Sequence, residues 1–177
     1  MEPSRSERNL IGDERAQLEA FLDDNRDELV ACVEGLTDKQ ARRRLVPSLT
    51  TPLGLLKHAV FAEKVWFHVA IAGRSRAEVG CPETVDESFI LTDEDTVASV
   101  VEEYRRTCAE AREIAASYSL DDLATHNRRG PLTVRWIHAH MIEELARHAG
   151  HADILREQLL AMGSDAEGGM DGEPRRP

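Results

Sequence analysis

Apolar residues recur at helical spacing in four long segments of the chain. In residues 13–36, 92–117 and 133–162 they return every three, four or seven positions, as in an amphipathic α-helix. Residues 51–72 are apolar on nearly every side, which indicates a helix that is buried all round. No segment has a pattern typical of a strand. The sequence therefore predicts an all-α fold, an up-down four-helix bundle.

Capping residues mark several of the helix starts. Thr51 can accept a hydrogen bond from the first turn of its helix, and Pro52 suits the first helical position, where the missing N–H costs nothing. The sequence TDKQ at 37–40 is a capping box and predicts one short additional turn. We interpret TDED at 92–95 in the same way, as the start of the third long helix.

Two connections separate the later helices. Residues 73–92 contain Gly80 and Pro82, and a loop of this length in a compact domain is usually functional or mobile. We expect it to border the functional site and to be more mobile than the helices. Residues 119–133 form the second connection, with a turn at Gly130.

The two ends of the chain differ in composition from the rest. Residues 1–11 are polar and are expected to form a flexible N-terminus. Residues 163–177 are polar and rich in glycine, and we expect a disordered C-terminal tail. The bundle is thus expected over residues 12–162. The whole chain has 177 residues, which suits one domain with a core of its own.

Composition and charge exclude several classes of function. The formal net charge is −11, so most of the surface would repel the phosphate backbone of a nucleic acid. No apolar run is long enough to span a membrane, and the first residues lack the apolar region of a signal peptide. The three cysteines are an odd count, which argues against a disulfide framework. We expect a cytoplasmic protein that binds neither nucleic acid nor membrane.

Polar residues in the sequence MIEELARHAGH, residues 141–151, fall on an apolar stripe of the fourth helix. At about 100° per residue, Glu144 projects within roughly 40° of His148, and His151 within roughly 60°. His148 itself projects at the centre of the stripe. The apolar residues within roughly 20° of it are Ile137, Met141, Leu155 and Leu159. Glu144 and His148 are therefore expected to point into the bundle.

A second histidine projects from an apolar stripe, on the second long helix. Measured from His58, Val65 and Val69 lie within about 20°, and Leu55 and Ala62 within roughly 60°. This helix is also apolar on the side opposite His58. The helical wheel is therefore weaker evidence that His58 points into the bundle than it is for His148. The other histidines are expected to be exposed or satisfied locally; they are His68, His126, His138 and His140.

A carboxylate in an apolar core needs a compensating positive charge, because an isolated one would take up a proton. Glu144 and His148 are four residues apart, so they project side by side and can share one metal ion. With His58 from another helix they provide three protein ligands, the number found in catalytic zinc sites. A histidine–glutamate hydrogen-bond network without metal accounts for the same spacing. The spacing alone leaves both interpretations open.

Three stretches of the chain resemble the DinB-like superfamily, and more closely its actinobacterial branch of mycothiol-dependent enzymes. The stretches are GDERAQLEAFLDDNRDELVACVEGLTDKQARRR, LGLLKHAVFAEKVWF and RWIHAHMIEELARHAGHADILRE. The superfamily has an up-down four-helix bundle, with one metal-ligating histidine in helix two and an H-x-x-x-H or E-x-x-x-H pair in helix four. The resemblance therefore implies His58, Glu144 and His148 as metal ligands. Many relatives have histidine at the position of Glu144, so zinc is expected here but nickel and iron stay open.

The resemblance also implies thiol chemistry. Relatives use the metal to bind a low-molecular-weight thiol and lower its pKa, and the thiolate attacks an electrophile or assists an isomerisation. We therefore hypothesise a metal-dependent S-transferase or isomerase that takes a mycothiol-like thiol and a small electrophilic substrate. His151, one turn after His148, is a candidate catalytic residue. The alternative is a non-catalytic stress-response bundle that binds a metal or a small molecule, and a homodimer is open in either case.

Overall fold

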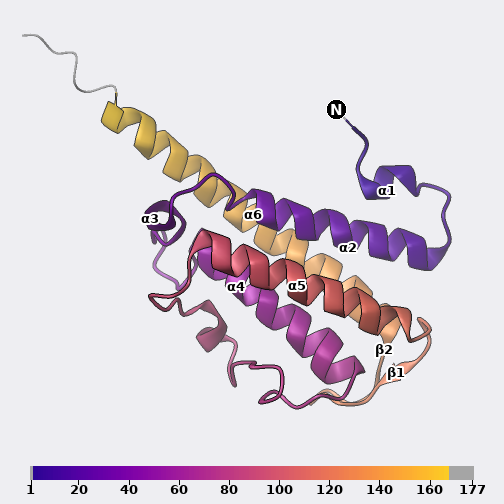
Figure 1. Cartoon of the computed structure of the whole chain (residues 1–177). Helices are drawn as coiled ribbons and strands as arrows, with labels where there is room; N and C mark the ends of the chain where they lie inside the picture. Colours follow the sequence, from indigo (N-terminus) through magenta and orange to yellow (C-terminus); the bar gives the residue numbers. More distant parts are fainter. Residues whose placement is uncertain (1, 168–177) are drawn as a thin grey trace, which may run out of the picture.

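Four long helices lie side by side and make up most of the structure (Figure 1). The computed structural model describes residues 2–167. The long helices are α2 (Glu14–Ala31), α4 (Pro52–Glu63) with its π-helical continuation η1 (Lys64–Ile71), α5 (Val97–Ala116) and α6 (Val134–Glu167). The short elements are α1 (Arg5–Arg8), α3 (Asp38–Ala41), the 3-10 helix η2 (Asp86–Phe89) and the strands β1 (Leu123–Ala124) and β2 (Leu132–Thr133). The all-α four-helix bundle predicted from the sequence is confirmed.

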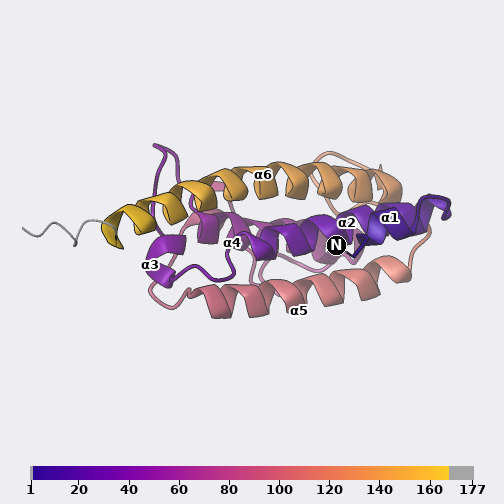
Figure 2. The same cartoon turned by 90° about the horizontal axis from the view of Figure 1, so that it is seen from above.

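The directions of the long helices follow from the connection between the second and the third. Lys57 pairs with Asp95, and Lys64, seven residues later, pairs with Glu103, eight residues after Asp95. Residue numbers therefore increase in the same direction along both segments, so α4 and α5 run parallel. Helices α2 and α6 run parallel to each other and opposite to α4 and α5 (Figures 1 and 2). The order is up, down, down, up, which differs from the alternating up-down order predicted from the sequence, because residues 72–96 carry the chain back along the bundle before α5 begins.

The core is built from the apolar stripes that the sequence predicts. On α6 the buried apolar residues of the stripe around His148 are Ile137, Met141, Ala152, Leu155 and Leu159. Helix α4 packs against both α5 and α6 and is buried on nearly every side, as its composition predicts. Within residues 2–167, no helix has the length and apolar character needed to cross a membrane.

Two of the predicted helix starts are confirmed. The Thr51 hydroxyl accepts a hydrogen bond from the Gly54 N–H at 3.0 Å, and Pro52 occupies the first helical position. The capping box at 37–40 begins the short helix α3. At both places the local side-chain chemistry is enough to fix where the helix begins.

The predicted TDED start of α5 is wrong. The Asp95 carboxylate accepts the N–H of Thr92 at 2.6 Å and pairs with Lys57, so these residues close a turn instead of a helix. The N-cap of α5 is Thr96, whose hydroxyl accepts the Ser99 N–H at 3.0 Å. The pattern missed this start because serine stands where a capping box usually has glutamate or glutamine.

A two-stranded hairpin, which the sequence pattern does not predict, joins α5 to α6. Its strands have two residues each, and Leu123 pairs with Thr133 in antiparallel register. The turn predicted at Gly130 is present, and this glycine has a φ of 89°, in the left-handed region where other residues are strained. Strands this short have no period that a sequence pattern can reveal.

Helix α6 is longer than predicted. It continues to Glu167, past the predicted end at Met162. The first part of the expected disordered tail is therefore helical. The rest of that tail, residues 168–177, lies outside the described residues.

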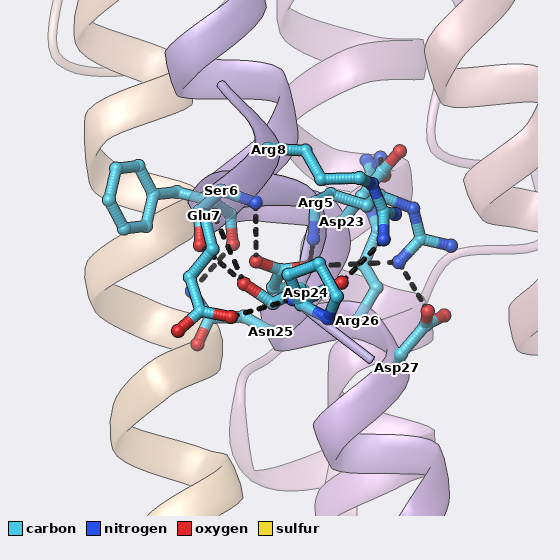
Figure 3. Close-up of polar contacts among 12 residues, drawn as sticks. Arg5, Ser6, Glu7, Arg8, Asp23, Asp24, Asn25, Arg26 and Asp27 are labelled. Atoms are coloured by element: carbon cyan, nitrogen blue, oxygen red, sulfur yellow. Dashed lines mark hydrogen bonds and ion pairs between the residues drawn. The ribbon is translucent and has the colours of Figure 1, made fainter. Parts of the chain in front are cut away.

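A carboxylate of α2 holds the short helix α1 against the bundle. Asp24 accepts hydrogen bonds from the backbone N–H groups of Arg5 and Ser6, each at 2.9 Å, and Arg5 also pairs with Asp27 (Figure 3). The N–H groups at the start of a helix lack partners within it, so an acceptor there is favourable. The polar sequence of residues 1–11 does not predict this helix, and the flexibility expected of these residues stays a prediction.

A buried ion pair joins α2 to α4. The Arg26 guanidinium donates to the two carboxylate oxygens of Glu63 at 2.8 Å and 2.6 Å, and the side chains are 4% and 0% exposed. Asp23 accepts from the same guanidinium at 2.8 Å. A bidentate pair fixes both distance and orientation. Since Glu63 lies on the helix that carries His58, the pair also fixes the position of that helix against α2.

Replacing Glu63 with alanine is expected to lower the free energy of unfolding by about 3 kcal/mol, measured by urea denaturation. Arg26 would keep its charge in the core, and breaking a buried pair costs about 3–5 kcal/mol; the remaining contact with Asp23 favours the lower end. The control is Glu103→Ala, whose more exposed pair with Lys64 contributes about 1 kcal/mol or less.

The double replacement Arg26→Met with Glu63→Leu should recover most of the lost stability, because it removes both charges. Equal effects of Glu63→Ala and Glu103→Ala on the unfolding free energy would contradict the role given to the buried pair.

Candidate metal centre

Three side chains from two helices meet at one carboxylate oxygen. Glu144 and His148 lie four residues apart on α6, and His58 reaches them from α4. The Oε1 atom of Glu144 lies 3.0 Å from Nε2 of His148 and 3.1 Å from Nε2 of His58. The structure thus brings together the three residues that the helical wheels place inward.

Glu144 carries a negative charge at neutral pH. Hydrogen bonds from His148 and His58 outweigh the opposing effect of burial and hold the pKa of this carboxyl well below its ordinary value. The side chain is only 19% exposed, so the charge is largely withdrawn from water and requires a compensating cation. That cation is either a protonated imidazole or a bound metal ion.

Hydrogen bonding fixes the orientation of His58. The Ser88 hydroxyl donates to the Val85 carbonyl, so its oxygen is left to accept the Nδ1–H of His58 at 2.7 Å. A neutral His58 then turns an unprotonated Nε2 toward Glu144, and two acceptors face each other across 3.1 Å. This contact is favourable only when a proton or a metal cation lies between the two atoms.

The donor set fits a divalent metal ion. One nitrogen or oxygen atom from each of His58, Glu144 and His148 lies within 4.8 Å of the other two. Ligand atoms at about 2 Å from one ion lie up to about 4 Å apart, so only small side-chain shifts separate this arrangement from coordination. Two imidazole nitrogens and a carboxylate oxygen are ligands that zinc accepts, and three protein ligands leave a position for a substrate.

Two of the three residues, His58 and Glu144, border a cleft of about 910 Å³. His148 is not part of its lining. The walls come from α4, η1 and α6, and the 72–96 connection and the β1–β2 hairpin contribute the rest. The apolar side chains that line it are Phe61, Ala62, Val65, Trp66, Val69 and Val85. A cleft of this size and character can hold a small molecule beside the candidate metal centre.

Part of the apolar wall comes from the π-helical segment η1. In this segment the N–H of Ala72 bonds to the carbonyl of Phe67, five residues earlier, which makes the turn wider than in an α-helix. Val65, Trp66 and Val69 all lie in η1 and face the cleft. The sequence predicts an ordinary α-helix here. Apolar periodicity does not distinguish the two, and π-helical turns are frequent at functional sites.

The 72–96 connection borders the site, as predicted. Its 3-10 helix η2 carries Ser88, which bonds to His58, and Phe89, whose ring stacks on that of His58 at 4.2 Å between centroids and 10° between planes. Together the hydrogen bond and the stacking fix the imidazole in both rotation and plane. The greater mobility expected of this connection stays a prediction.

Two further histidines line the cleft, although the sequence pattern does not predict them there. His126 comes from the hairpin, and His140 from α6. The His140 ring stacks on the Trp136 indole, with centroids 4.9 Å apart. A signal for His140 was available, because it lies four residues before Glu144 and therefore about one turn away on a neighbouring face.

The remaining histidines lie outside the cleft lining. His138 is buried and satisfied locally, with Nδ1 bonded to the Val134 carbonyl at 2.9 Å. His68 is only half satisfied, because its Nδ1 contacts the Arg74 guanidinium at 3.3 Å while its buried Nε2 has no hydrogen-bond partner within residues 2–167. His151 is exposed, and its ring centroid lies 5.9 Å from that of His148. Its catalytic role stays a prediction.

None of the three cysteines lines the cleft. All are buried as free thiols. Burial raises the pKa of Cys32 to about 11 and that of Cys108 well above its ordinary value. Because the thiolate is the reactive form, these residues are poor nucleophiles. Thiol chemistry at this site would therefore use a thiol from outside the chain.

Comparison with known proteins identifies one family. The family model described as Mycothiol-S-transferase matches residues 17–161, a range that includes all three residues of the candidate metal centre. A search of curated proteins found no match. The resemblance to the mycothiol-dependent branch of the DinB-like superfamily, stated above from three sequence stretches, is confirmed.

Replacing Ser88 with alanine is expected to weaken zinc binding by about tenfold or more. The variant loses the acceptor that holds Nδ1–H of His58, and residues that orient a ligand typically contribute that much to metal affinity. Competition with a chromophoric chelator measures the affinity. Ser117→Ala, at the end of α5, is the control and should bind zinc as the unaltered protein does. Unchanged affinity in Ser88→Ala would show that Ser88 does not orient a ligand.

Proposed function

The chain belongs to the mycothiol-S-transferase family, and from that premise we propose that it is a divalent-metal-dependent enzyme that transfers a low-molecular-weight thiol to a small electrophile. The proposed thiol is mycothiol or a similar molecule, and the proposed ion is zinc. His58, Glu144 and His148 would hold the ion. The observation that carries the proposal is the Glu144 carboxylate, which lies between two imidazole nitrogens at the border of a cleft.

The chemistry divides between the ion and the protein. A divalent ion bound there would lower the pKa of a coordinated thiol, so that the nucleophilic thiolate is present at neutral pH. Glu144 would offset part of the positive charge, and Ser88 holds His58 in the tautomer that turns Nε2 toward the site. In the transfer itself the thiol loses its proton to solvent. The sulfur–carbon bond forms as the leaving group departs with the electrons of the bond it breaks.

The apolar wall accounts for how a small electrophile would be held. Phe61, Val65 and Val69 line the same cleft as His58 and Glu144. Burial of apolar substrate surface against them contributes about 25 cal/mol per Å². The wall also keeps water from the reacting atoms. Recognition of any charged group on the electrophile is left to the polar residues of the cleft.

We also propose a cytoplasmic location and a homodimer. The three cysteines are free thiols, which suits a reducing compartment. Ile154, Leu160 and Met162 are exposed apolar residues in the C-terminal half of α6, and a second copy of the chain could cover them. His151, exposed beside His148, is proposed to exchange the thiol proton with solvent.

Replacing Glu144 with glutamine is expected to lower metal affinity by at least about tenfold, because a neutral amide is a poorer ligand than a carboxylate. Transferase activity should fall with the metal content, while the fold survives, since glutamine has almost the same shape. Elemental analysis and a mycothiol-conjugation assay on the same samples measure both quantities. Glu143→Gln is the control, because its side chain is 63% exposed on the same helix and should leave both quantities unchanged.

The same assay tests the function. Conjugation of mycothiol to an electrophile should stop after treatment with a chelator and return when zinc is restored; restoration with nickel or iron instead would identify another native ion. Full metal occupancy in both the unaltered protein and Glu144→Gln would show that Glu144 is not a ligand. A metal-loaded protein that conjugates no thiol would be a non-catalytic binding protein, and the proposal would be wrong.

A further inference from the structure

The net charge of the residues that line the cleft is positive, whereas the net charge of the whole chain is negative. The formal net charge is −11, yet the acidic residues of the lining are only Glu83 and Glu144, and the second of these belongs to the candidate metal centre. The basic residues of the lining are Arg76, Arg128, Arg129 and Arg147. A cleft with low-dielectric walls strengthens the field of the charges around it. The lining therefore attracts an anion.

The four arginines differ in whether their side chains already form hydrogen bonds or ion pairs within the protein. Arg147 forms an ion pair along α6, and Arg76 donates to the Pro82 carbonyl. Within residues 2–167, the side chains of Arg128 and Arg129 form no hydrogen bond or ion pair. Both lie in the turn of the β1–β2 hairpin, which brings them to the cleft from the far end of the bundle.

Arg129 is held by aromatic rings instead of by an acid. Its guanidinium lies over the Trp66 ring at 5.4 Å and over the Trp136 ring at 5.9 Å from the centroids. His140 packs against both indoles. A cation–π contact holds a guanidinium near the rings without using its N–H groups as hydrogen-bond donors to an acid. The N–H groups of Arg129 therefore stay available as donors to an oxyanion.

The distance to the metal centre suits a small molecule. Trp136 precedes Glu144 by about two turns of α6, roughly 12 Å along the helix axis. Trp66 and His140 line the cleft, and the His140 ring contacts both Trp66 and Trp136. A ligand whose anionic group bonds to Arg129 would extend along this wall toward His58 and Glu144.

We infer that Arg129 determines specificity by binding the anionic group of the electrophile. The substrate class is small electrophiles that carry a carboxylate or a comparable oxyanion at the end remote from the reacting carbon. This inference deepens the proposed transferase function and rests on it where it calls the ligand an electrophile. The binding of an organic carboxylate at Arg129 is independent of turnover, so the two can be tested apart.

Binding is measured first, without thiol, on the protein as purified. The probes are 3,5-dinitrobenzoate and its uncharged counterpart 3,5-dinitrobenzamide, which have no leaving group. The chain has two tryptophans, and both contact Arg129, so quenching of their fluorescence reports on this part of the cleft. The benzoate is expected to bind at least about fivefold more tightly than the benzamide.

Substitutions at Arg129 separate charge recognition from a structural role. Arg129→Gln should weaken benzoate binding at least about fivefold and leave benzamide binding within about twofold. Arg129→Lys keeps the charge but loses the flat donor edge, and should be intermediate. Arg106→Gln, an exposed arginine of α5 outside the cleft lining, makes the same change in net charge and should alter neither affinity.

Turnover is then measured with zinc-loaded protein and mycothiol, using 4-chloro-3,5-dinitrobenzoate and the matching benzamide. The thiolate attacks the ring carbon, a carbon–sulfur bond forms, chloride leaves, and the thiol proton passes to solvent. Each rate is divided by the uncatalysed rate, because the two rings differ in reactivity. The preference for the benzoate should be lost in Arg129→Gln and retained in Arg106→Gln.

The outcomes distinguish the inference from the function on which it rests. Selective binding of the benzoate that Arg129→Gln abolishes, without any turnover by the unaltered protein, supports the anion site and overturns the transferase. Turnover of both electrophiles without charge preference supports the transferase and overturns the anion site. Equal weakening of both probes by Arg129→Gln would mean that Arg129 only holds the hairpin in place, and would also overturn the inference.

Discussion

Glu144 carries a negative charge that is largely withdrawn from water. The residues around it compensate this charge and hold the carboxylate and its neighbours in position. Two imidazoles direct Nε2 at one of its oxygens. One of them, His58, is fixed in turn by the hydroxyl of Ser88 and by the ring of Phe89. The helix that carries His58 is tied to α2 by the buried pair between Arg26 and Glu63. The geometry of the centre therefore depends on contacts spread over the bundle, and a change in any of them moves a prospective ligand.

The order of the helices explains why residues from the connecting segments, and not only from the helices, contribute to the site. Since α4 and α5 run parallel, the chain must return along the bundle between them, and the returning segment passes the centre. That segment supplies Ser88 and Phe89 to one side of His58. At the other end of the bundle, the β1–β2 hairpin brings Arg129 to the same cleft. An ordinary four-helix bundle with short connections would have the helix residues alone and none of these contacts.

The sequence predicts the parts of this arrangement that depend on helical period and local capping. The wheel places Glu144 and His148 inward because both share a stripe with residues such as Met141, and Thr51 fixes the start of α4 by its own hydrogen bond. The parts that depend on contacts between distant segments could not be predicted. The pair Arg26–Glu63, the acceptor Ser88 and the aromatic setting of Arg129 have no local signature. The π-helical segment has none either, because it has the same apolar composition as the α-helix it continues.

The most direct test of the account is an anomalous diffraction measurement, at the zinc absorption edge, on crystals of the zinc-loaded protein soaked with thiol. The account predicts one anomalous peak within about 2 Å of Nε2 of His58, Nε2 of His148 and a carboxylate oxygen of Glu144, with thiol sulfur as a further ligand on the cleft side. A fully occupied ion elsewhere, or hydrogen-bonded His58, Glu144 and His148 with no anomalous peak between them, would contradict it.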